Sequence, residues 1–390
     1  MIDYNSVLSK KVTELKPSGI RKFFDLLETM DDVISLTVGE PDFLTPWHIR
    51  ESAIEALEKG RTRYTSNSGT MALRVAISEY LARRYELKYD PKSEIIVTVG
   101  GSEAIDLAIR ALVAPGDEVI LPMPSFVCYD PLVHMADGVS VIINTKEKDK
   151  FKLKAEDLRA AITPKTKLLI LPYPSNPTGA IMTKEDLEAI ADVLRGTDIM
   201  VLTDEIYAEL TYGRKHTSFA SIEGMRERTV VASGFSKAYA MTGWRMGYIC
   251  APEPVARQML KIHQFAIMCA PTISQFAAIE AMKNGDEDVQ TMVEEYDRRR
   301  RYIYDGLKTI GIDCFEPEGA FYIYPKIGGF GMKSDEFAER LLYEHKVAIV
   351  PGTAFGECGE GFARISYAYS VKHIGEALER IEDFVKKIKR

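Results

Sequence analysis

The chain has 390 residues, of which 46% are hydrophobic and 27% charged, and this ordinary globular composition excludes a disordered, collagen-like or small disulfide-stapled protein. Its formal net charge of −7 argues against non-specific binding to nucleic acid or to an anionic membrane surface. No run of 18 apolar residues occurs and the polar N-terminus lacks the apolar region of a signal peptide, so we expect no membrane span and a cytoplasmic location.

The metal-binding residue types are scattered along the chain. The five cysteines are odd in number and show no CxxC spacing, and the six histidines form no HxxxH or HxH pair. We therefore expect reduced thiols and no metal site.

Short apolar, β-branched runs alternate with helix-like segments through the middle of the chain. In chain order we expect a strand over residues 95–99, a helix over 102–112, strands over 119–121 and 168–171, a helix over 185–194, and strands over 200–202 and 230–231. Buried strands separated by helices predict an α/β fold with a mostly parallel sheet covered on both faces.

The last third of the chain has a different character. A long charged helix is expected over residues 286–306, with its arginine run at 298–301 on a solvated face, and strand-like pieces at 321–324 and 364–367 alternate with helices. Because 390 residues exceed one ordinary core, we predict a large domain over residues 46–285. Residues 1–45 and 286–390 are expected to form a smaller α+β domain.

Polar segments follow the predicted strands, where an open α/β sheet binds its ligands. After the first strand, Gly100-Gly101-Ser102 opens a helix and offers free N–H groups and a hydroxyl to an anion. Neither GxGxxG nor GxxxxGK[ST] occurs there, so a dinucleotide or ATP site lacks its usual pattern.

Two further residues suggest covalent chemistry. Lys237 follows the last predicted strand, and burial near a second cation such as Arg245 would lower its pKa and make the amine nucleophilic. Asp204 closes a neighbouring strand and could pair with a protonated ring nitrogen. Taken alone, each has an ordinary structural interpretation, as a surface charge or a helix cap.

Three other polar residues extend this pattern. Tyr207 and Asn176 could hydrogen-bond a phenolate-like oxygen, and Arg364 could bind a carboxylate through two parallel hydrogen bonds. A reactive lysine, an acid for a ring nitrogen, donors for a ring oxygen and a phosphate-binding turn are together what pyridoxal 5′-phosphate (PLP) requires.

Motifs spread over nearly the whole chain resemble one family. SNPTG at residues 175–179, DEIY at 204–207 and SKxxxMTGWR at 236–245 are similar to those of the fold-type I, class I/II PLP-dependent aminotransferases. The resemblance implies the aspartate-aminotransferase fold, with a large PLP-binding domain. The segments at residues 18–23, 171–177 and 205–212 look closest to bacterial aromatic and N-acetyl-diaminopimelate aminotransferases.

The resemblance implies a role for each matching residue. Lys237, Asp204 and Tyr207 would be catalytic, and Gly39, Asn176 and Arg364 would bind the substrate. The implied cofactor contacts are Gly101, Ser102, Glu103, Phe126, Asn176, Asp204, Tyr207, Ser236, Lys237, Arg245 and, reaching the neighbouring subunit's cofactor, Tyr64. Many relatives carry serine three residues before the lysine, but this chain has Gly234 there and Ser233 before it.

The implied reaction is a ping-pong transamination through a Schiff base on Lys237. It moves an amino group between an L-amino acid, aromatic or N-acetyl-diaminopimelate, and a 2-oxo acid, for which we expect 2-oxoglutarate. The family also implies a homodimer with shared active sites. We find no second arginine for a distal carboxylate in the sequence, so aspartate is a less favoured donor.

Other functions remain open at this stage. A PLP-dependent carbon–sulfur β-lyase on the same fold would share Lys237 and Asp204 but would release pyruvate and ammonia. The aminotransferase-like effector domain of a transcription regulator is a further alternative, although we expect no DNA-binding domain before Pro17.

Overall fold

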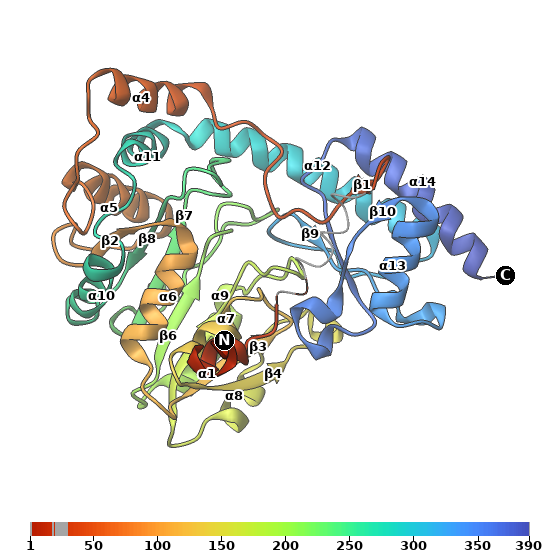
Figure 1. Ribbon diagram of the computed structural model, residues 1–390, viewed down its shortest axis with the longest axis horizontal. Helices are drawn as coiled ribbons and strands as arrows, with labels where there is room; N and C mark the ends of the chain where they lie inside the picture. Colours follow the sequence, from red (N-terminus) through yellow and green to blue (C-terminus); the bar gives the residue numbers. More distant parts are fainter. Residues whose placement is uncertain (1, 18, 20–29, 390) are drawn as a thin grey trace.

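The computed structural model describes residues 2–17, 19 and 30–389. A seven-stranded sheet forms its centre, and a smaller group of strands and helices follows it in the sequence (Figure 1). In spatial order the sheet consists of β2 (Ile95–Thr98), β8 (Gly247–Cys250), β7 (Thr229–Gly234), β6 (Met200–Asp204), β5 (Thr166–Leu171), β3 (Glu118–Met123) and β4 (Val139–Asn144).

The sheet is mostly parallel, as predicted. Only β8 runs antiparallel to its neighbours β2 and β7, while β7, β6, β5, β3 and β4 are parallel to one another. Sequence analysis missed β8 and the edge strand β4. β8 is only four residues long and comes directly after the polar motif at residues 236–245. β4 is partly exposed and lacks a continuous apolar pattern.

Helices cover both faces of this sheet because its strands are apolar on both sides. In β6, Val201 packs into one core and Leu202, the next residue, into another on the opposite face. The helices on one face are α6 (Gly100–Leu112), α7 (Tyr129–Met135) and α10 (Glu253–Ala266). Those on the other are α5 (Met71–Tyr85), α8 (Ala155–Ala161) and α9 (Lys184–Leu194), with α4 (Trp47–Glu58) and α11 (Thr272–Asn284) outside α5.

A 25-residue helix, α12 (Asp286–Ile310), connects the two parts of the molecule (Figure 1). Val289 at its start packs with the core around α5, and Met292, Tyr296, Ile303 and Leu307 pack into the C-terminal core. These residues are spaced by three, four or seven positions, so they lie on one buried stripe of the helix.

The C-terminal part is an α+β unit. Its antiparallel sheet has the order β11 (Val350–Pro351), β12 (Ala363–Ser366) and β9 (Tyr322–Ile323), and α13 (Ser334–His345) and α14 (Val371–Ile388) pack beside it. The early strand β1 (Ile34–Ser35) joins this part by pairing in parallel with β10 (Val347–Ala348).

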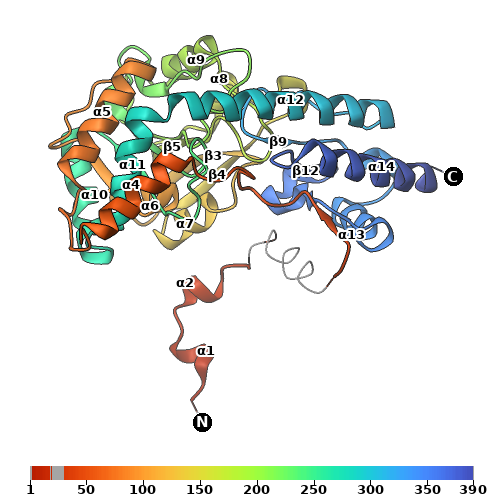
Figure 2. The same cartoon turned by 90° about the horizontal axis from the view of Figure 1, so that it is seen from above.

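The first two helices lie elsewhere. α1 (Tyr4–Val7) and α2 (Lys10–Thr13) extend from the body of the molecule (Figure 2), and Lys11 of α2 pairs with Asp137, just beyond α7. This short segment thus contacts the sheet part through α2 and α7. The domain boundaries at residues 46 and 286 stay a prediction, and the motif at 18–23 lies outside the described residues apart from Gly19.

The arginine run on α12 is only half solvated, which corrects the expectation. Arg298 and Arg301 are exposed, but Arg299 is buried and pairs with Asp42 and Glu295. Arg300 is also largely buried. Every arginine of the run has a carboxylate partner.

Candidate active site

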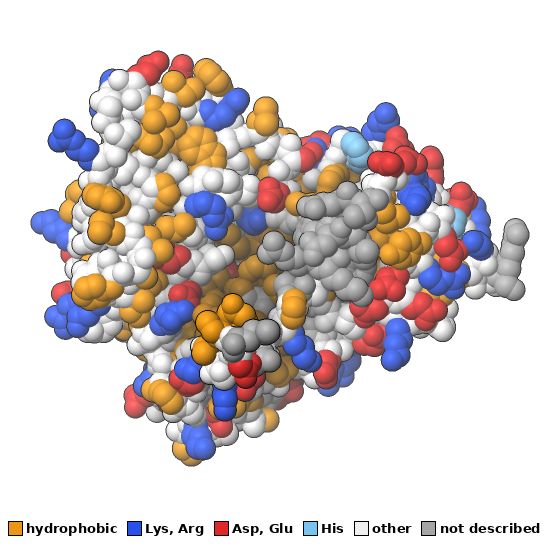
Figure 3. Space-filling view, viewed as in Figure 1, with side chains coloured by type: hydrophobic (Ala, Val, Ile, Leu, Met, Phe, Trp, Pro, Cys, Tyr) orange, Lys and Arg blue, Asp and Glu red, His pale blue; other side chains and the backbone are white. Residues whose placement is uncertain are grey.

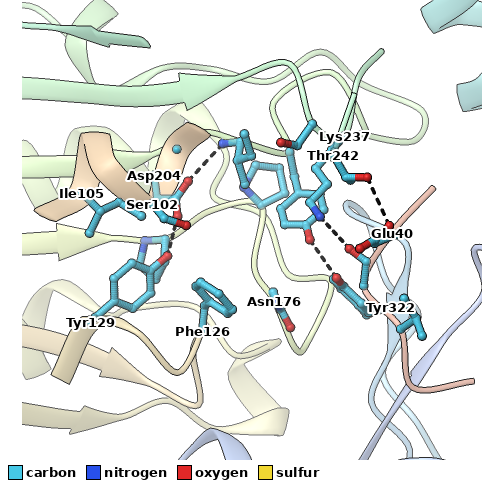
Figure 4. A pocket seen from close by; sticks show the side chains of 18 of the residues that line it. Glu40, Ser102, Ile105, Phe126, Tyr129, Asn176, Asp204, Lys237, Thr242 and Tyr322 are labelled. Carbon is cyan, nitrogen blue, oxygen red and sulfur yellow. Dashed lines mark hydrogen bonds between the residues drawn. The ribbon is translucent and has the colours of Figure 1, made fainter. Parts of the chain in front are cut away.

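A cavity of about 580 Å³ lies where the carboxyl ends of β5, β6 and β7 meet the start of α6 and the C-terminal part (Figure 4). Strand and loop order explains this convergence, because parallel strands end at the same sheet edge. The cavity is lined by Gly39, Gly101, Ser102, Phe126, Asn176, Asp204, Tyr207, Ser236, Lys237, Arg245 and Arg364 from the predicted set, and by Val38, Glu40, Ile105, Tyr129, Pro172, Pro174, Ile206, Thr242, Gly243 and Tyr322 in addition.

Lys237 points into the middle of the cavity. Its Nζ donates a hydrogen bond to the carbonyl oxygen of Gly39 at 2.5 Å. Burial lowers the pKa of Lys237 to about 8, and the nearby guanidinium groups of Arg364 and Arg245 act in the same direction, against the opposing charge of Glu40. The amine is therefore partly neutral near pH 7, as a nucleophile or proton acceptor must be.

Asp204, the last residue of β6, is buried at the sheet edge with both carboxylate oxygens bonded. Oδ2 accepts from the Tyr129 hydroxyl at 2.6 Å, and Oδ1 accepts from the Ile206 N–H at 3.1 Å (Figure 4). Burial raises the pKa of Asp204 above its ordinary value, although these hydrogen bonds oppose the rise. A cationic ring nitrogen placed against this carboxylate would stabilise its charged form.

The opposite end of the cavity centres on Arg364, in the middle of β12. Its Nη1 donates to Asn176 Oδ1 at 2.9 Å and its Nη2 to the Thr37 carbonyl at 2.5 Å. The guanidinium carbon lies 4.6 Å from the ring centroid of Tyr322. Among the described residues the Nε has no hydrogen-bond partner although it is buried, so within that part of the chain this arginine keeps an unused donor beside the cavity.

Tyr207 and Tyr322 join the two ends. Their hydroxyl groups lie 2.8 Å apart, with Tyr207 from the loop after β6 and Tyr322 from β9 (Figure 4). Burial raises the pKa of Tyr207 well above its ordinary value, so this side chain stays a neutral hydrogen-bond donor.

An anion-binding turn forms at the start of α6. Gly100 has a left-handed φ of +75°, and a Cβ there would lie 2.6 Å from Nη2 of Arg245, so only glycine lets this guanidinium approach the turn. The free N–H groups of a helix start, the Ser102 and Ser236 hydroxyls and the Arg245 cation all border the same cavity. With Asp204 and Lys237 beyond them, these residues fit the phosphate, ring nitrogen and aldehyde of PLP.

Two residues expected at the cofactor do not line this cavity. Glu103 directs its carboxylate to the Val99 N–H and to His263 and not into the cavity, so its contact with the cofactor stays a prediction. A buried carboxylate needs hydrogen-bond donors, and those of Glu103 lie on the side of the turn that faces away from the cavity. Tyr64 is 81% exposed and also lies outside the cavity lining of its own chain.

The structure explains the departure at Gly234. A Cβ there would lie 2.9 Å from the Met246 carbonyl oxygen, closer than side chains normally approach. Ser233 donates to the Glu205 carbonyl at 3.1 Å and does not border the cavity. A serine at 234 would require the backbone to shift.

Sequence reasoning missed several cavity residues, among them Tyr129 and Tyr322, whose hydroxyl groups bond predicted site residues. Tyr129 stands only three residues after Phe126, and this closeness to a predicted ring contact could have signalled it. Tyr322 had no comparable signal, because it stands in an aromatic strand of ordinary core composition.

The described part of the chain offers neither a group of metal ligands nor a membrane-spanning helix. No three His, Cys, Asp or Glu side chains there are grouped to hold a metal ion. Likewise, none of its helices has the length and hydropathy needed to cross a membrane.

Comparison with known proteins agrees with this site. The family model for class I and II aminotransferases matches residues 31–381. The Bacillus subtilis protein YugH, which is named as an aminotransferase, is 54% identical over 98% of this chain and 99% of its own length. A second Bacillus subtilis protein, named as an N-acetyl-LL-diaminopimelate aminotransferase, is 46% identical over 98% of this chain and 96% of its own.

A solved structure shares the fold. The aromatic aminotransferase of Pyrococcus horikoshii superposes with a TM-score of 0.90 at 44% identity, covering 94% of this chain and 99% of that one. The fit of the cavity to PLP and the end-to-end match lead to one conclusion. The chain belongs to the class I and II aminotransferases, PLP-dependent enzymes that transfer amino groups.

Proposed function

We propose that this aminotransferase exchanges amino groups between an aromatic L-amino acid or N-acetyl-diaminopimelate and 2-oxoglutarate, by a ping-pong mechanism. The observation that carries the proposal is one cavity that holds an amine of lowered pKa, a buried carboxylate and an arginine with a free donor. These are Lys237, Asp204 and Arg364, and no two of them come from the same element.

The cofactor would be held at the sheet edge. The N–H groups of Gly101 and Ser102, the Ser102 and Ser236 hydroxyls and Arg245 would bind its phosphate. Asp204, oriented by Tyr129, would hold a negative charge at the ring nitrogen. In a further set of contacts, Tyr207 and the amide of Asn176 would donate to the ring oxygen, and Phe126 would face the ring.

When bound, PLP supplies an aldehyde that takes up the amino group and a ring that accepts the electron pair left by the departing α-proton. Arg364 would orient the substrate by its α-carboxylate, with the Gly39 backbone alongside. Lys237 would then accept the α-proton and return it. With a pKa of about 8, about a tenth of this amine is neutral at pH 7.

The walls of the cavity support a bulky apolar donor. Ile105, Phe126, Pro174 and Ile206 contribute apolar surface to the cavity. Arg245 is assigned to the cofactor phosphate, so it would not bind a distal carboxylate of the donor. Glu40, which also lines the cavity, would repel such a carboxylate. The likeness to an N-acetyl-LL-diaminopimelate aminotransferase supports the alternative donor.

Substrate choice is tested by measuring kcat/KM for phenylalanine, tyrosine, N-acetyl-LL-diaminopimelate and aspartate, each with 2-oxoglutarate. We expect one of the first three to exceed aspartate by about tenfold or more, with parallel double-reciprocal lines. A preference for aspartate, or pyruvate and ammonia formed without any 2-oxo acid, would contradict the proposal.

We also propose a homodimer in which Tyr64 reaches the partner's cofactor. Large apolar side chains are exposed around α4 and at the end of α10, including Leu44 (78%), Trp47 (57%) and Phe265 (86%). Figure 3 shows hydrophobic side chains gathered over the part of this face that carries α4. A second copy of the chain would cover this surface.

Mixing two impaired variants tests this arrangement. If Tyr64 acts across the interface, Tyr64→Ala and Lys237→Ala chains form a hybrid dimer with one intact site, and the mixture recovers up to about a quarter of wild-type activity. Recovery no greater than the sum of the parents, or a fully active monomer in sedimentation, would overturn the proposal. The cytoplasmic location stays a prediction.

A further inference from the structure

Behind the anion-binding turn lies a pair of polar residues that the mechanism above does not use. Glu103 in the first turn of α6 accepts the Val99 N–H through Oε2 at 2.5 Å, and its Oε1 lies 2.6 Å from Nδ1 of His263. The His263 side chain on α10 is fully buried and that of Glu103 is only 11% exposed. Such a pair is stable only if its polar groups are well satisfied.

The histidine is held in a fixed position. Its carbonyl oxygen accepts from the N–H groups of Ile267 and Met268 at the end of α10. Its Nε2 is buried without a hydrogen-bond partner among the described residues, so the ring is held through Nδ1. Because a carboxylate oxygen can only accept, the Nδ1–H donates to Glu103.

The pair acts on the turn that faces the cavity. Val99 immediately precedes Gly100, Gly101 and Ser102, and the Glu103 carboxylate fixes its N–H from behind. On the other side, the Thr98 hydroxyl donates to the Gly100 carbonyl at 2.9 Å. Hydrogen bonds at the Val99 N–H and at the Gly100 carbonyl thus fix the backbone where β2 leads into α6.

The position of Glu103 places a negative charge close to the proposed phosphate site. A carboxylate in the first turn of α6 interacts favourably with the helix dipole, but it repels a phosphate bound at the same helix start. Here two N–H donors compensate its charge, one from Val99 and one from His263. Its side chain stays out of the cavity that Ser102, its neighbour, borders.

We propose that Glu103 and His263 are positioning residues that fix the Val99–Ser102 turn for phosphate binding. The inference rests on the cofactor placement proposed above. It predicts a selective effect: losing the pair weakens ligands that carry the phosphate and leaves phosphate-free ligands almost unaffected.

The test compares dissociation constants of PLP and pyridoxal, which lacks the phosphate, on the full-length apoprotein by equilibrium dialysis. Glu103→Ala should weaken PLP binding about tenfold, by the loss of two charge-assisted hydrogen bonds, and pyridoxal binding less than about twofold. Glu103→Gln keeps an acceptor for Val99 and should restore most of the PLP affinity. His263→Leu should weaken PLP binding selectively, and His263→Asn, which keeps a donor near the Nδ1 position, should restore it.

Asp186 provides a matched control on another helix. Its carboxylate likewise accepts the N–H of the residue preceding its helix, Thr183, and pairs with a basic side chain, Lys152. It does not line the cavity. Asp186→Ala should lower the melting temperature without changing the ratio of the PLP and pyridoxal dissociation constants.

The outcomes separate the two proposals. An unchanged ratio in Glu103→Ala, or an equal loss of PLP and pyridoxal affinity, would overturn the positioning role. If Glu103→Ala does not fold, the His263→Leu and His263→Asn pair decides the question by the same ratio. Wild-type protein that binds no PLP would overturn the proposed function itself.

Discussion

The two ends of the cavity differ in how completely their polar groups are satisfied. At the sheet edge, both oxygens of Asp204 accept hydrogen bonds from the protein. At the opposite end, Arg364 uses two of its nitrogens, and its buried Nε has no partner in the part of the chain that the structure describes. The comparison indicates a rigid end for a resident cofactor and an end with spare donor capacity for a substrate that enters and leaves.

The two ends also have different origins in the chain. The sheet edge is built by residues 100–245, whereas the Arg364 end combines β12 and β9 of the C-terminal part with the segment around Gly39. Changes at one end should therefore affect cofactor chemistry, and changes at the other should affect substrate affinity. The predictions below test that separation.

The largest effect is expected for Lys237→Ala, which removes the amine between the two ends. Turnover should fall by ~10⁴-fold or more, because proton transfer and covalent bonding to the cofactor are both lost. Steady-state assays with the preferred donor measure this. Activity above about 5% of wild type, well beyond what loss of such a nucleophile allows, would contradict the assignment.

Asp204→Asn should lower kcat by ~10³-fold while changing donor KM only a few-fold, because it removes a charge at the cofactor end and keeps the side-chain shape. Glu205→Gln is the matched control, since Glu205 is also buried but lies outside the cavity lining. Burial raises the pKa of Asp204, whereas His216 and Ser218 hold the pKa of Glu205 low despite burial. Equal losses in both variants would refute a special role for Asp204.

Arg364→Leu should have the opposite kinetic signature. Loss of the carboxylate-binding cation should raise donor KM by ~10²-fold and leave the PLP dissociation constant within about twofold of wild type, because the phosphate has its own cation. Steady-state kinetics and dialysis against PLP measure the two constants. A comparable loss of PLP affinity would break the separation between the ends.

The uptake of PLP by the apoprotein should depend on pH through Lys237. Its pKa of about 8 means that the neutral, nucleophilic amine increases about tenfold between pH 7 and pH 9. The rate of chromophore formation after adding PLP should rise over that interval and then level off. A rate that still climbs steeply above pH 9 would indicate a lysine with its ordinary pKa.

The smallest effect is expected for Tyr129→Phe. It removes one hydrogen bond to Asp204 and should lower kcat about three- to tenfold without changing donor KM. Tyr322→Phe offers a comparison at the other end, where the change should appear in KM. An unchanged kcat in Tyr129→Phe would show that the Ile206 N–H alone holds the carboxylate.

Local patterns predicted the sheet and the residues at its edge. Short apolar strands followed by polar segments place Asp204 and Lys237 together, because parallel strands end at one edge. The same pattern suggested a nucleophilic amine and a partner for a ring nitrogen, and the family resemblance implied their specific roles. β8 was not predicted, because a four-residue strand is too short to show a clear hydrophobic periodicity.

What could not be predicted depends on contacts between distant parts of the chain. Glu103 belongs to a helix start that resembles a cofactor contact, but the direction of its carboxylate is set by His263, 160 residues away in the sequence. Arg299 lies in a charged run that resembles a solvated surface, yet its ion pair with Asp42 requires the folded chain. The Tyr207–Tyr322 contact likewise joins two separate parts of the molecule.

The most direct test of the account is an absorbance spectrum of the PLP-loaded protein through one half of its cycle. Adding phenylalanine, tyrosine or N-acetyl-LL-diaminopimelate alone should shift the near-ultraviolet to visible band and release a stoichiometric amount of 2-oxo acid, and 2-oxoglutarate should then restore the band. A band that never shifts while pyruvate and ammonia accumulate, or protein that acquires no chromophore with PLP, would contradict it.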